Sequence, residues 1–386
     1  MPRRPKKPTA EQFSGLERVF IHFAPLDDPR TARTRRHELL HILVMSLCGA
    51  ICGADGWEAL EEFAESKAEW FEELFDLPYG TPSADTFRRV LCALDTEQFE
   101  QCFRGWINDV AKIFKGEVIA LDGKSLRGAI EKAGSTTPLH LVQAWASEQR
   151  LMLGQRAAAG GASGEPAAMV ELLKLFDLEG AVVTTDANGC TQAVLDAVRN
   201  ARADFVIALK GNRGPQLRHV QEAFSQAKPN EMSTSSTTNT GHGRKEARIV
   251  YALPATGWSW PEWAGVKSFV MIERVRQATT NDTSTESSFF LSSLPPDAAV
   301  LADKIRKHWS IENQLHWVLD VAFGEDAQRV RDARGAQNFA LLNRLALMLV
   351  RNETTKKKGA PTKRKRAGWD NNYLALVLTR GLEPTV

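Results

Sequence analysis

The sequence has no apolar run long enough to cross a bilayer. The longest such run, 39–52, contains His41, Ser46 and Gly49 and falls short of the roughly 20 residues that a membrane-spanning helix needs. The basic start, Met1 to Pro8, is not followed by the apolar core of a signal peptide. We therefore expect a cytoplasmic protein with no membrane partner, in which 39–52 forms a buried helix.

Cysteine is also scarce. The five cysteines lie among apolar neighbours, and none forms a CxxC pair. This spacing argues against a structural zinc site. Their number and setting are typical of small core side chains in a reducing compartment. They are Cys48, Cys52, Cys92, Cys102 and Cys190.

Net charge is low, at +2, but the charges are segregated. Basic residues gather in 1–36, 356–358 and 363–366, and acidic residues gather in 58–76. Basic segments near both ends favour a polyanionic partner. Solubilising tails explain the basic segments equally well when charge is considered alone.

A length of 386 residues favours two or three domains. We predict a basic disordered tail at 1–16 and a basic C-terminal tail at 351–386. Helical periodicity between them predicts an all-helical module at 17–110. The remaining segment, 111–350, has strands in tandem followed by strand–helix alternation, which indicates an α/β fold.

Two aspartates in the α/β segment follow apolar strands. Asp122 follows 118–121, and Asp186 follows 181–185. Sites in open α/β sheets gather at strand ends, although an aspartate there can simply cap a turn. Two aspartates in the same setting favour a metal pair.

A third carboxylate, Glu312, lies on a helix predicted from Pro296 to about Phe323. The helix face that carries Glu312 is apolar apart from His308, one turn earlier, which could hold the carboxylate by a hydrogen bond. The alternative is a Glu–His pair satisfied within the core. Three such carboxylates suit Mg²⁺ or Mn²⁺, and two ions of this kind support phosphodiester chemistry.

Polar residues near the predicted site could hold phosphates: Lys124, Arg127, Lys210 and Asn212. The segment 211–295 reads as an insert, with a polar loop at 233–240 and strands near 248–251, 266–272 and 287–291. A later helix is predicted at 336–350.

The motifs, in order, resemble the DDE transposases of the H-repeat-associated insertion-sequence family from about Phe20 to Val350. They include Asp122-Gly-Lys-Ser-Leu-Arg-Gly128, Thr185-Asp-Ala187, Ala208-Leu-Lys-Gly-Asn212, Gly241-His-Gly-Arg-Lys-Glu246 and His308-Trp-Ser-Ile-Glu-Asn313. Ile305, His308 and Leu319 stand where many relatives have Tyr, Arg and Lys.

The resemblance implies an RNase H-like mixed-sheet catalytic core with a β-rich insert, preceded by the helical module. It implies Asp122, Asp186 and Glu312 as catalytic residues and metal ligands, and metal-dependent cleavage and strand transfer of insertion-sequence DNA. It also implies a homo-oligomer that pairs DNA ends. Phosphate contacts are expected from the basic residues named above and from His242, Arg244 and His308.

Relatives with an insert can stack a Trp on a flipped base. Trp260, or its neighbours Trp258 and Trp263, could do so here, since bases stack on aromatic rings. The alternative is that these rings pack the insert's own small core.

Two other functions remain open at this point. His37-Glu-Leu-Leu-His41, with Glu61 as a third ligand, matches the zinc-protease pattern. A domesticated or decayed transposase would keep the fold and bind DNA without cutting it.

Overall fold

The computed structural model describes residues 17, 19–130, 137–241, 244–277 and 283–380. The expected disordered tail at 1–16 lies outside this range. After the 3-10 turn η1 (Ala32–Thr34), five helices follow as predicted for the first hundred residues. They are α2 (Leu39–Cys52), α3 (Trp57–Ser66), α4 (Ala68–Leu74), α5 (Ala84–Ala93) and α6 (Thr96–Val110).

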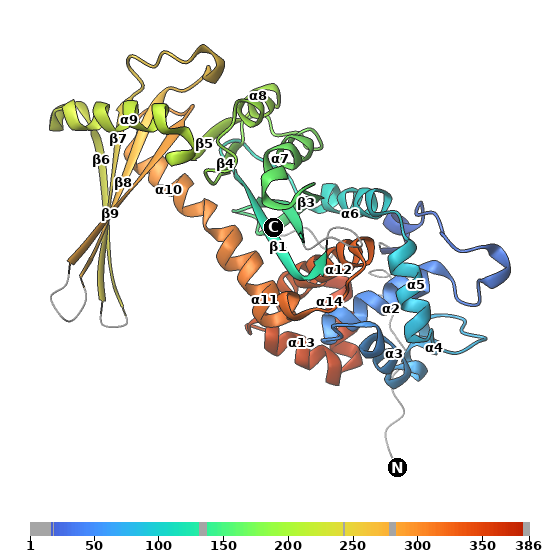
Figure 1. Ribbon diagram of the computed structural model, residues 1–386. Helices are drawn as coiled ribbons and strands as arrows, with labels where there is room; N and C mark the ends of the chain where they lie inside the picture. The colour runs from blue at the N-terminus through green and yellow to red at the C-terminus, as the bar shows by residue number, and fades with distance from the viewer. Residues whose placement is uncertain (1–16, 18, 131–136, 242–243, 278–282, 381–386) are drawn as a thin grey trace.

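A mixed sheet forms the centre of the molecule (Figure 1). Its core strands are β1 (Val118–Ile130), β2 (Pro138–Ala146), β3 (Leu151–Ala157), β4 (Val182–Thr185) and β5 (Asp204–Leu209). β1 pairs antiparallel with β2 and parallel with β4, and β5 continues the parallel part. The crossover helices are α7 (Glu165–Leu173) and α8 (Gln192–Asn200). This arrangement confirms the predicted mixed α/β core.

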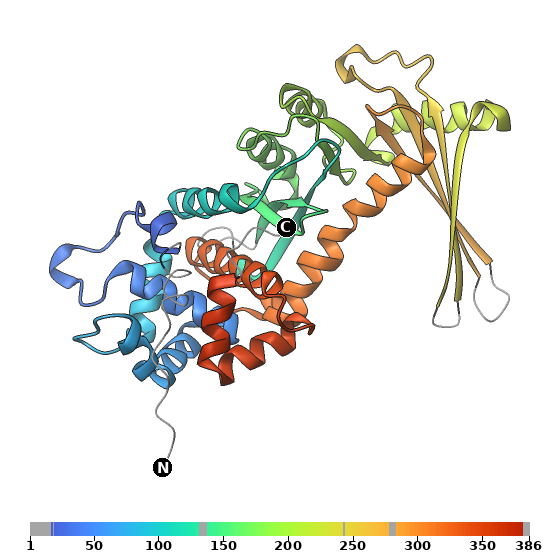
Figure 2. The ribbon, with the colours of Figure 1, turned by 180° about the vertical axis from the view of Figure 1, so that it is seen from behind.

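The β-rich insert extends this same sheet instead of forming a separate one. After α9 (Gly214–Gln226), its strands are β6 (Ser233–Gly241), β7 (Arg244–Pro254), β8 (Ser268–Gln277) and β9 (Thr283–Ser292). The full order is β3-β2-β1-β4-β5-β9-β8-β7-β6. The insert strands project away from the N-terminal helices, as both ribbon views show (Figures 1 and 2).

The prediction of a polar loop at 233–240 was wrong, because this segment is most of β6. Its serines and threonines pair in register with β7 from Ser233–Ala252 to Gly241–Arg244. Threonine is β-branched and suits a strand with little burial. The low complexity of the segment hid this strand propensity.

The helix predicted from Pro296 to Phe323 is not a uniform α-helix. It consists of α10 (Ala298–His308), a π-helical segment η6 (Ile311–His316) and α11 (Trp317–Phe323). A π-helical turn changes which residues share a face, and such turns are frequent at functional sites. The remaining short 3-10 segments are η2 (Gly161–Gly164), η3 (Gly211–Arg213), η4 (Pro229–Glu231), η5 (Pro261–Trp263) and η7 (Glu325–Ala327).

The C-terminal region differs from the predicted basic tail at 351–386. After α12 (Ala333–Asn352), residues 360–380 form α13 (Ala360–Trp369) and α14 (Asn371–Arg380). Arg364 is buried and donates through Nη2 to Ala50 O at 2.8 Å, while Lys363 Nζ donates to Val350 O at 3.0 Å. These cations satisfy carbonyls at the ends of α2 and α12, where helix dipoles favour positive charge.

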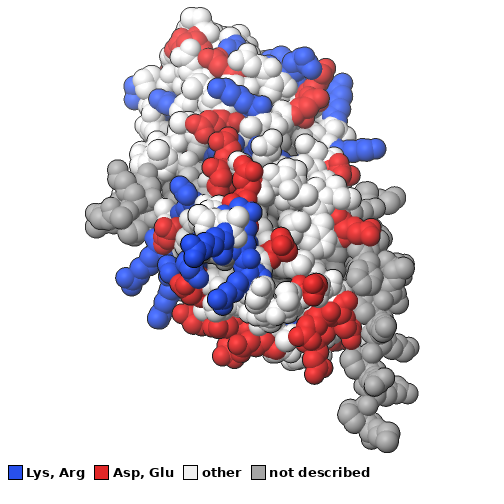
Figure 3. All heavy atoms as spheres, turned by 90° about the vertical axis from the view of Figure 1, so that its right-hand side faces the viewer, with Lys and Arg blue, Asp and Glu red and all other residues white. Residues whose placement is uncertain are grey.

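The helical region therefore joins both ends of the chain, because α12 packs against α2 and α5. On its outer face the acidic and basic side chains occupy separate areas (Figure 3). No single helix in the described part of the chain is long and apolar enough to cross a membrane. The pair α2 and α3 together has the length and composition of a membrane span, but the two helices meet at a bend of 96°.

Candidate active site

Strand pairing brings the two aspartates to one edge. In the parallel pair of β1 and β4, Leu121 lies opposite Thr185. Asp122 and Asp186 are each the next residue along the chain. Both line a cleft of about 670 Å³ that Glu312 also lines. All three carboxylates predicted from the sequence line this cleft, but among the described residues the group close enough to share one metal contains Asp122 and Glu312 and not Asp186.

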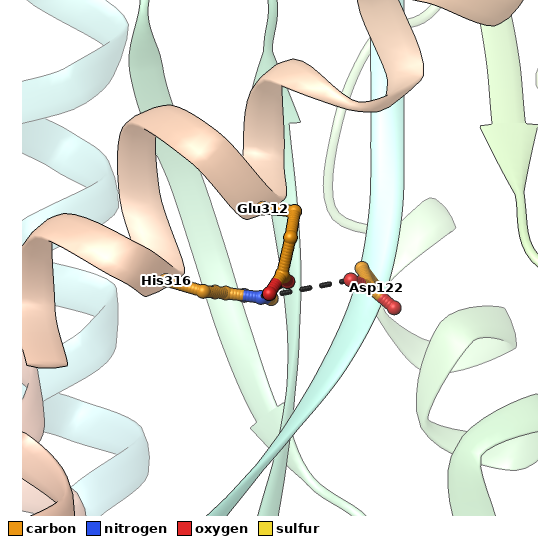
Figure 4. A group of neighbouring side chains, drawn as sticks. All are labelled: Asp122, Glu312 and His316. Atoms are coloured by element: carbon orange, nitrogen blue, oxygen red, sulfur yellow. Dashed lines mark hydrogen bonds and ion pairs between the residues drawn. The ribbon is translucent and has the colours of Figure 1, made fainter. Parts of the chain in front are cut away.

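Glu312 reaches this cleft from the π-helical segment. The ligand atoms of Asp122, Glu312 and His316 lie within 4.8 Å of one another, and Figure 4 shows the three side chains converging. The Glu312 side chain is 54% exposed. The prediction that it lies on a buried apolar stripe was therefore wrong, because the stripe was drawn for a regular α-helix.

His316, and not His308, holds Glu312. Its Nδ1 lies 3.0 Å from Glu312 Oε2 and 3.6 Å from Asp122 Oδ2. His308 Nδ1 lies 3.0 Å from Thr184 Oγ1 instead. Sequence reasoning missed His316, although its position four residues after Glu312 is a spacing at which side chains interact on a helix.

A buried chain of polar groups fixes the ring of His316. The Gln143 amide donates to His316 Nε2 at 2.5 Å and accepts from Arg344 Nη2 at 2.6 Å. The opposite amide orientation would place its nitrogen against the arginine donors. With Gln143 donating to Nε2, Nδ1 is the ring nitrogen that donates to Glu312. Arg344 is held by a fully buried ion pair with Glu325, at 2.6 Å.

The three carboxylates of the cleft differ in their pKa shifts: those of Asp122 and Asp186 are raised, and that of Glu312 is lowered. Burial raises the pKa of Asp122 to about 6, and the negative charges of Asp186 and Glu312 add to this rise against the effect of His316. Burial, together with the charge of Glu165, also raises the pKa of Asp186. The hydrogen bond from His316 lowers the pKa of Glu312. A divalent cation would relieve this accumulated negative charge.

A second polar network that the sequence did not predict lies beneath Asp186. The buried Glu165 contacts His140 Nε2 at 2.5 Å and accepts from Asn188 Nδ2 at 2.8 Å, while His140 Nδ1 lies 2.8 Å from Ser125 Oγ. A Cβ atom at Gly123 would lie 2.1 Å from Glu165 Oε1. Glycine after Asp122 is therefore required by this close approach.

The predicted phosphate contacts near β1 have other partners. Lys124 Nζ is buried and forms an ion pair with Asp320 at 2.6 Å. Arg127 is 80% exposed and lies 3.6 Å from Asp326. Of the two, only Arg127 extends into solvent.

At the end of β5, Lys210 is exposed and lines the cleft, and its positive charge offsets part of the rise in the pKa of Asp186. Asn212 donates to Ala187 O at 2.8 Å. His308 also lines the cleft, where burial lowers its pKa to about 4. Thus Lys210 is the predicted cation that lies beside the carboxylates.

Two further predicted DNA contacts, His242 and Arg244, lie wholly or partly outside the described residues. His242 lies outside the described residues, and Arg244 is described only as the first backbone position of β7. Trp260 packs in an aromatic cluster, with ring centroids 4.6 Å from Trp258 and 5.3 Å from His219. This packing favours the interpretation that the insert tryptophans build a local core.

The zinc-protease pattern does not form a single helical face. The α2 helix begins at Leu39 and its N-cap is Glu38, so His37 precedes the helix. The His41 ring stacks on Phe75 at 4.4 Å. In the described part of the chain, a single group of side chains is close enough to share a metal. It consists of Asp122, Glu312 and His316 and includes neither His37 nor His41.

Comparison with known families agrees with this geometry. Residues 113–349 match the family model of the transposase DDE domain, and residues 20–107 match the model of the region associated with that domain. The first match covers the sheet, its insert and the π-helical segment. It identifies the core as RNase H-like.

Similar proteins span nearly the same length. "Putative transposase YncI" of Escherichia coli O157:H7 is 33% identical over 94% of this chain and 95% of its own. "H repeat-associated putative transposase YhhI" of Escherichia coli K12 is 31% identical over 94% and 98%. A short relative from the same strain, 34% identical over 20% of this chain, is named "Inactive transposase YbfQ". On the family match and these relatives, the chain belongs to the DDE transposase family.

Proposed function

We propose that this protein is an active transposase, which cuts phosphodiester bonds at the ends of an insertion sequence and joins them to target DNA. The observation that carries the proposal is the meeting of Asp122, Asp186 and Glu312 in one cleft. Two of them come from adjacent parallel strands and the third from a helix that crosses the sheet.

The donor set suits Mg²⁺ or Mn²⁺, which prefer carboxylate oxygens, and we propose two such ions. When bound, they would activate a water or a 3′-hydroxyl and stabilise the leaving oxygen. Asp122 and Asp186 would hold the ions from the sheet, and Glu312 would complete one of the sites. His316 orients Glu312, and Lys210 is placed to contact a phosphate oxygen.

DNA is the proposed partner, both as element ends and as target, and paired ends call for a homo-oligomer. The helical module at 17–110 is the proposed end-binding or assembly unit. Exposed arginines of this module are available for such contacts, namely Arg33, Arg35, Arg36, Arg88 and Arg89.

A second candidate is a protein that binds DNA without cutting it. Ile305 and Leu319, at signature positions of the family, are buried, and His308 contacts Thr184. None of these three residues therefore offers a cationic side chain for DNA binding. This observation favours a domesticated or decayed transposase that binds DNA without cutting it.

Cleavage of DNA carrying the element's own ends decides between the two. Wild-type protein should nick this DNA only with Mg²⁺ or Mn²⁺, and Asp122→Asn, Asp186→Asn and Glu312→Gln should each abolish nicking. As a matched control, Asp196→Asn, on an exposed pair with Arg199, should cut normally. Binding without metal-dependent nicking by wild type would establish the second candidate.

A further inference from the structure

The insert turns one row of charged side chains toward α10. In the paired strands, Thr237 lies opposite Arg248, Arg248 opposite Arg274, and Arg274 opposite Glu286. Side chains directly opposite in a ladder share a face of the sheet. The next row toward the core contains Val250 opposite Ile272.

A groove of about 450 Å³ lies between this face and α10. Its lining includes four arginines and no acidic residue among the described residues. Three arginines come from the sheet and one from the helix: Arg248, Arg274, Arg276 and Arg306. Val250, Ile272 and Ile305 provide apolar surface between them.

Within the part of the chain that the structure describes, these arginines are only partly neutralised by acidic partners. Arg248 and Arg274 are cross-strand neighbours of like charge, an arrangement that destabilises a sheet. Glu246 is shared by Arg248 at 2.6 Å, Arg274 at 3.6 Å and Arg276 at 3.5 Å. Glu286 lies 3.6 Å from Arg274. Counted over the described residues, four arginines against two glutamates leave an excess of two positive charges, which a bound anion would offset.

The groove opens into the catalytic cleft. Arg274, Ile305 and Trp309 line both the groove and the cleft that contains Asp122, Asp186 and Glu312. Trp309 is 52% exposed and precedes Glu312 by three residues. Gln314 also lines the groove, and its buried Oε1 has no hydrogen-bond partner among the described residues. The Trp309 ring thus lies where the groove meets the cleft, and the groove also contains a polar atom without a partner among the described residues.

We propose that this arginine groove binds the DNA strand that continues from the phosphodiester held at Asp122, Asp186 and Glu312. The guanidinium groups contact successive phosphates, and the Trp309 ring stacks on a base beside the cut site. The proposal rests on the proposed function, because it extends the path of the same substrate.

The combination of groups favours a nucleic acid strand over a small anion. A single phosphate would occupy one or two arginines, whereas these four extend from β7 and β8 across to α10. Cationic side chains interleaved with an exposed aromatic ring and apolar floor are the usual surface for single-stranded DNA, because phosphates and bases are bound at once.

The test measures DNA binding in EDTA, where metal-dependent cutting does not proceed. A labelled single-stranded oligonucleotide and a duplex of the element end are titrated at several salt concentrations. The variants are Arg306→Gln, Arg276→Gln and the triple Arg248→Gln/Arg276→Gln/Arg306→Gln. The matched control is Arg199→Gln/Arg202→Gln, which removes two exposed arginines paired with Asp196 and Glu179.

Each phosphate-binding arginine should contribute about 0.7 to 0.9 to the slope of log Kd against log salt. For the triple variant we expect the slope of log Kd against log salt to fall by about two and the affinity to fall at least tenfold. The control variant should bind as wild type does. Arg306 donates to Thr237 at 3.4 Å, a long bond at an exposed position. The single variant Arg306→Gln should therefore fold and can test the proposal if the triple variant does not.

Trp309→Ala should weaken binding about tenfold at unchanged slope, because it removes a base contact and no charge. An unchanged slope in Arg306→Gln, Arg276→Gln and the triple variant would overturn the proposal, as would wild-type protein that binds no DNA. Nicking by wild type is measured separately. If wild type does not nick but the arginine variants lose slope, the groove proposal stands and the proposed catalysis fails.

Discussion

Nδ1 of His316 lies 3.0 Å from Oε2 of Glu312, four residues earlier on the π-helical segment. The bond couples an exposed carboxylate to a buried imidazole whose other nitrogen is already engaged by Gln143. The helix that carries Glu312 thereby connects to the sheet through side chains as well as through backbone packing. Partners of this kind orient metal-binding groups and influence metal affinity.

Replacing His316 should impair the site without abolishing it. We expect His316→Ala to lower the nicking rate about 10- to 100-fold and to raise the Mg²⁺ concentration needed for half-maximal rate. His316→Asn, which retains a donor, should recover part of the loss. His22→Ala, at an ion pair with Asp109 on the helical module, is the control. An unchanged Mg²⁺ dependence in His316→Ala would show that the ring has no positioning role.

Asp122→Asn should stabilise the metal-free protein at high pH. The folded-state pKa of Asp122 rises from 3.8 to about 6, so the folded state binds its proton more tightly than the unfolded state. The contribution of Asp122 to the free energy of unfolding of the wild type is therefore greatest below about pH 4 and is lost as pH rises through about 6. Asparagine removes this loss, which is at most about 3 kcal/mol.

Thermal unfolding in EDTA at pH 8 and pH 4 measures the effect of Asp122→Asn. The variant should melt higher than wild type at pH 8, and the difference should disappear near pH 4. Asp196→Asn, at an exposed position, should show no such pH-dependent difference. A variant that melts lower than wild type at pH 8 would contradict the destabilising burial of the Asp122 charge.

Gly123→Ala should destabilise the fold and reduce activity. The new methyl group would lie 2.1 Å from Glu165 Oε1 and 2.3 Å from His140 Nε2, so one of these buried groups must move. Overpacking of this kind costs about 1–3 kcal/mol, and disruption of a buried hydrogen-bond network adds to it.

Gly211→Ala is the matched control for Gly123→Ala, because a Cβ atom there meets no heavy atom within 4 Å. Gly211 lines the same cleft. Urea unfolding of both variants gives the free energies of unfolding. Equal stabilities would show that the network beneath Asp186 can relax freely.

Breaking the buried Arg344–Glu325 pair should cost much more than breaking a surface pair. Both side chains have 0% exposure, so Arg344→Leu leaves an unpaired buried carboxylate and should lose about 3–5 kcal/mol of unfolding free energy. Arg202→Gln, at the exposed pair with Glu179, should change it by about 0.5 kcal/mol or less.

The double variant Arg344→Leu/Glu325→Leu tests the mechanism of that loss. Since neither charge remains, it should recover part of the stability. It should still nick slowly, because Gln143 no longer has a partner that orients its amide toward His316. Normal nicking by a stable double variant would show that the Arg344–Glu325 ion pair does not affect the active site.

The sequence by itself determined the parts that depend on local patterns. Apolar runs before Asp122 and Asp186 predicted two strands correctly. The predicted strand end at Asp122 was wrong, because β1 continues to Ile130 and only its pairing with β4 stops there. Helical periodicity predicted the N-terminal helices and most of the helix that carries Glu312. The motifs, in their order along the chain, predicted the family, because they combine residue type with spacing over nearly the whole chain.

Only the tertiary structure decided which groups meet. Glu312 is turned toward Asp122 by a π-helical turn, and His316 is fixed by Gln143, 173 residues away. Lys363 and Arg364 belong to a packed helix because their partners are carbonyls on distant helices. The arginines of the groove share a face only once strand register is set. Register, helix packing and buried hydrogen bonds join residues far apart in the chain, and no local pattern specifies those pairings.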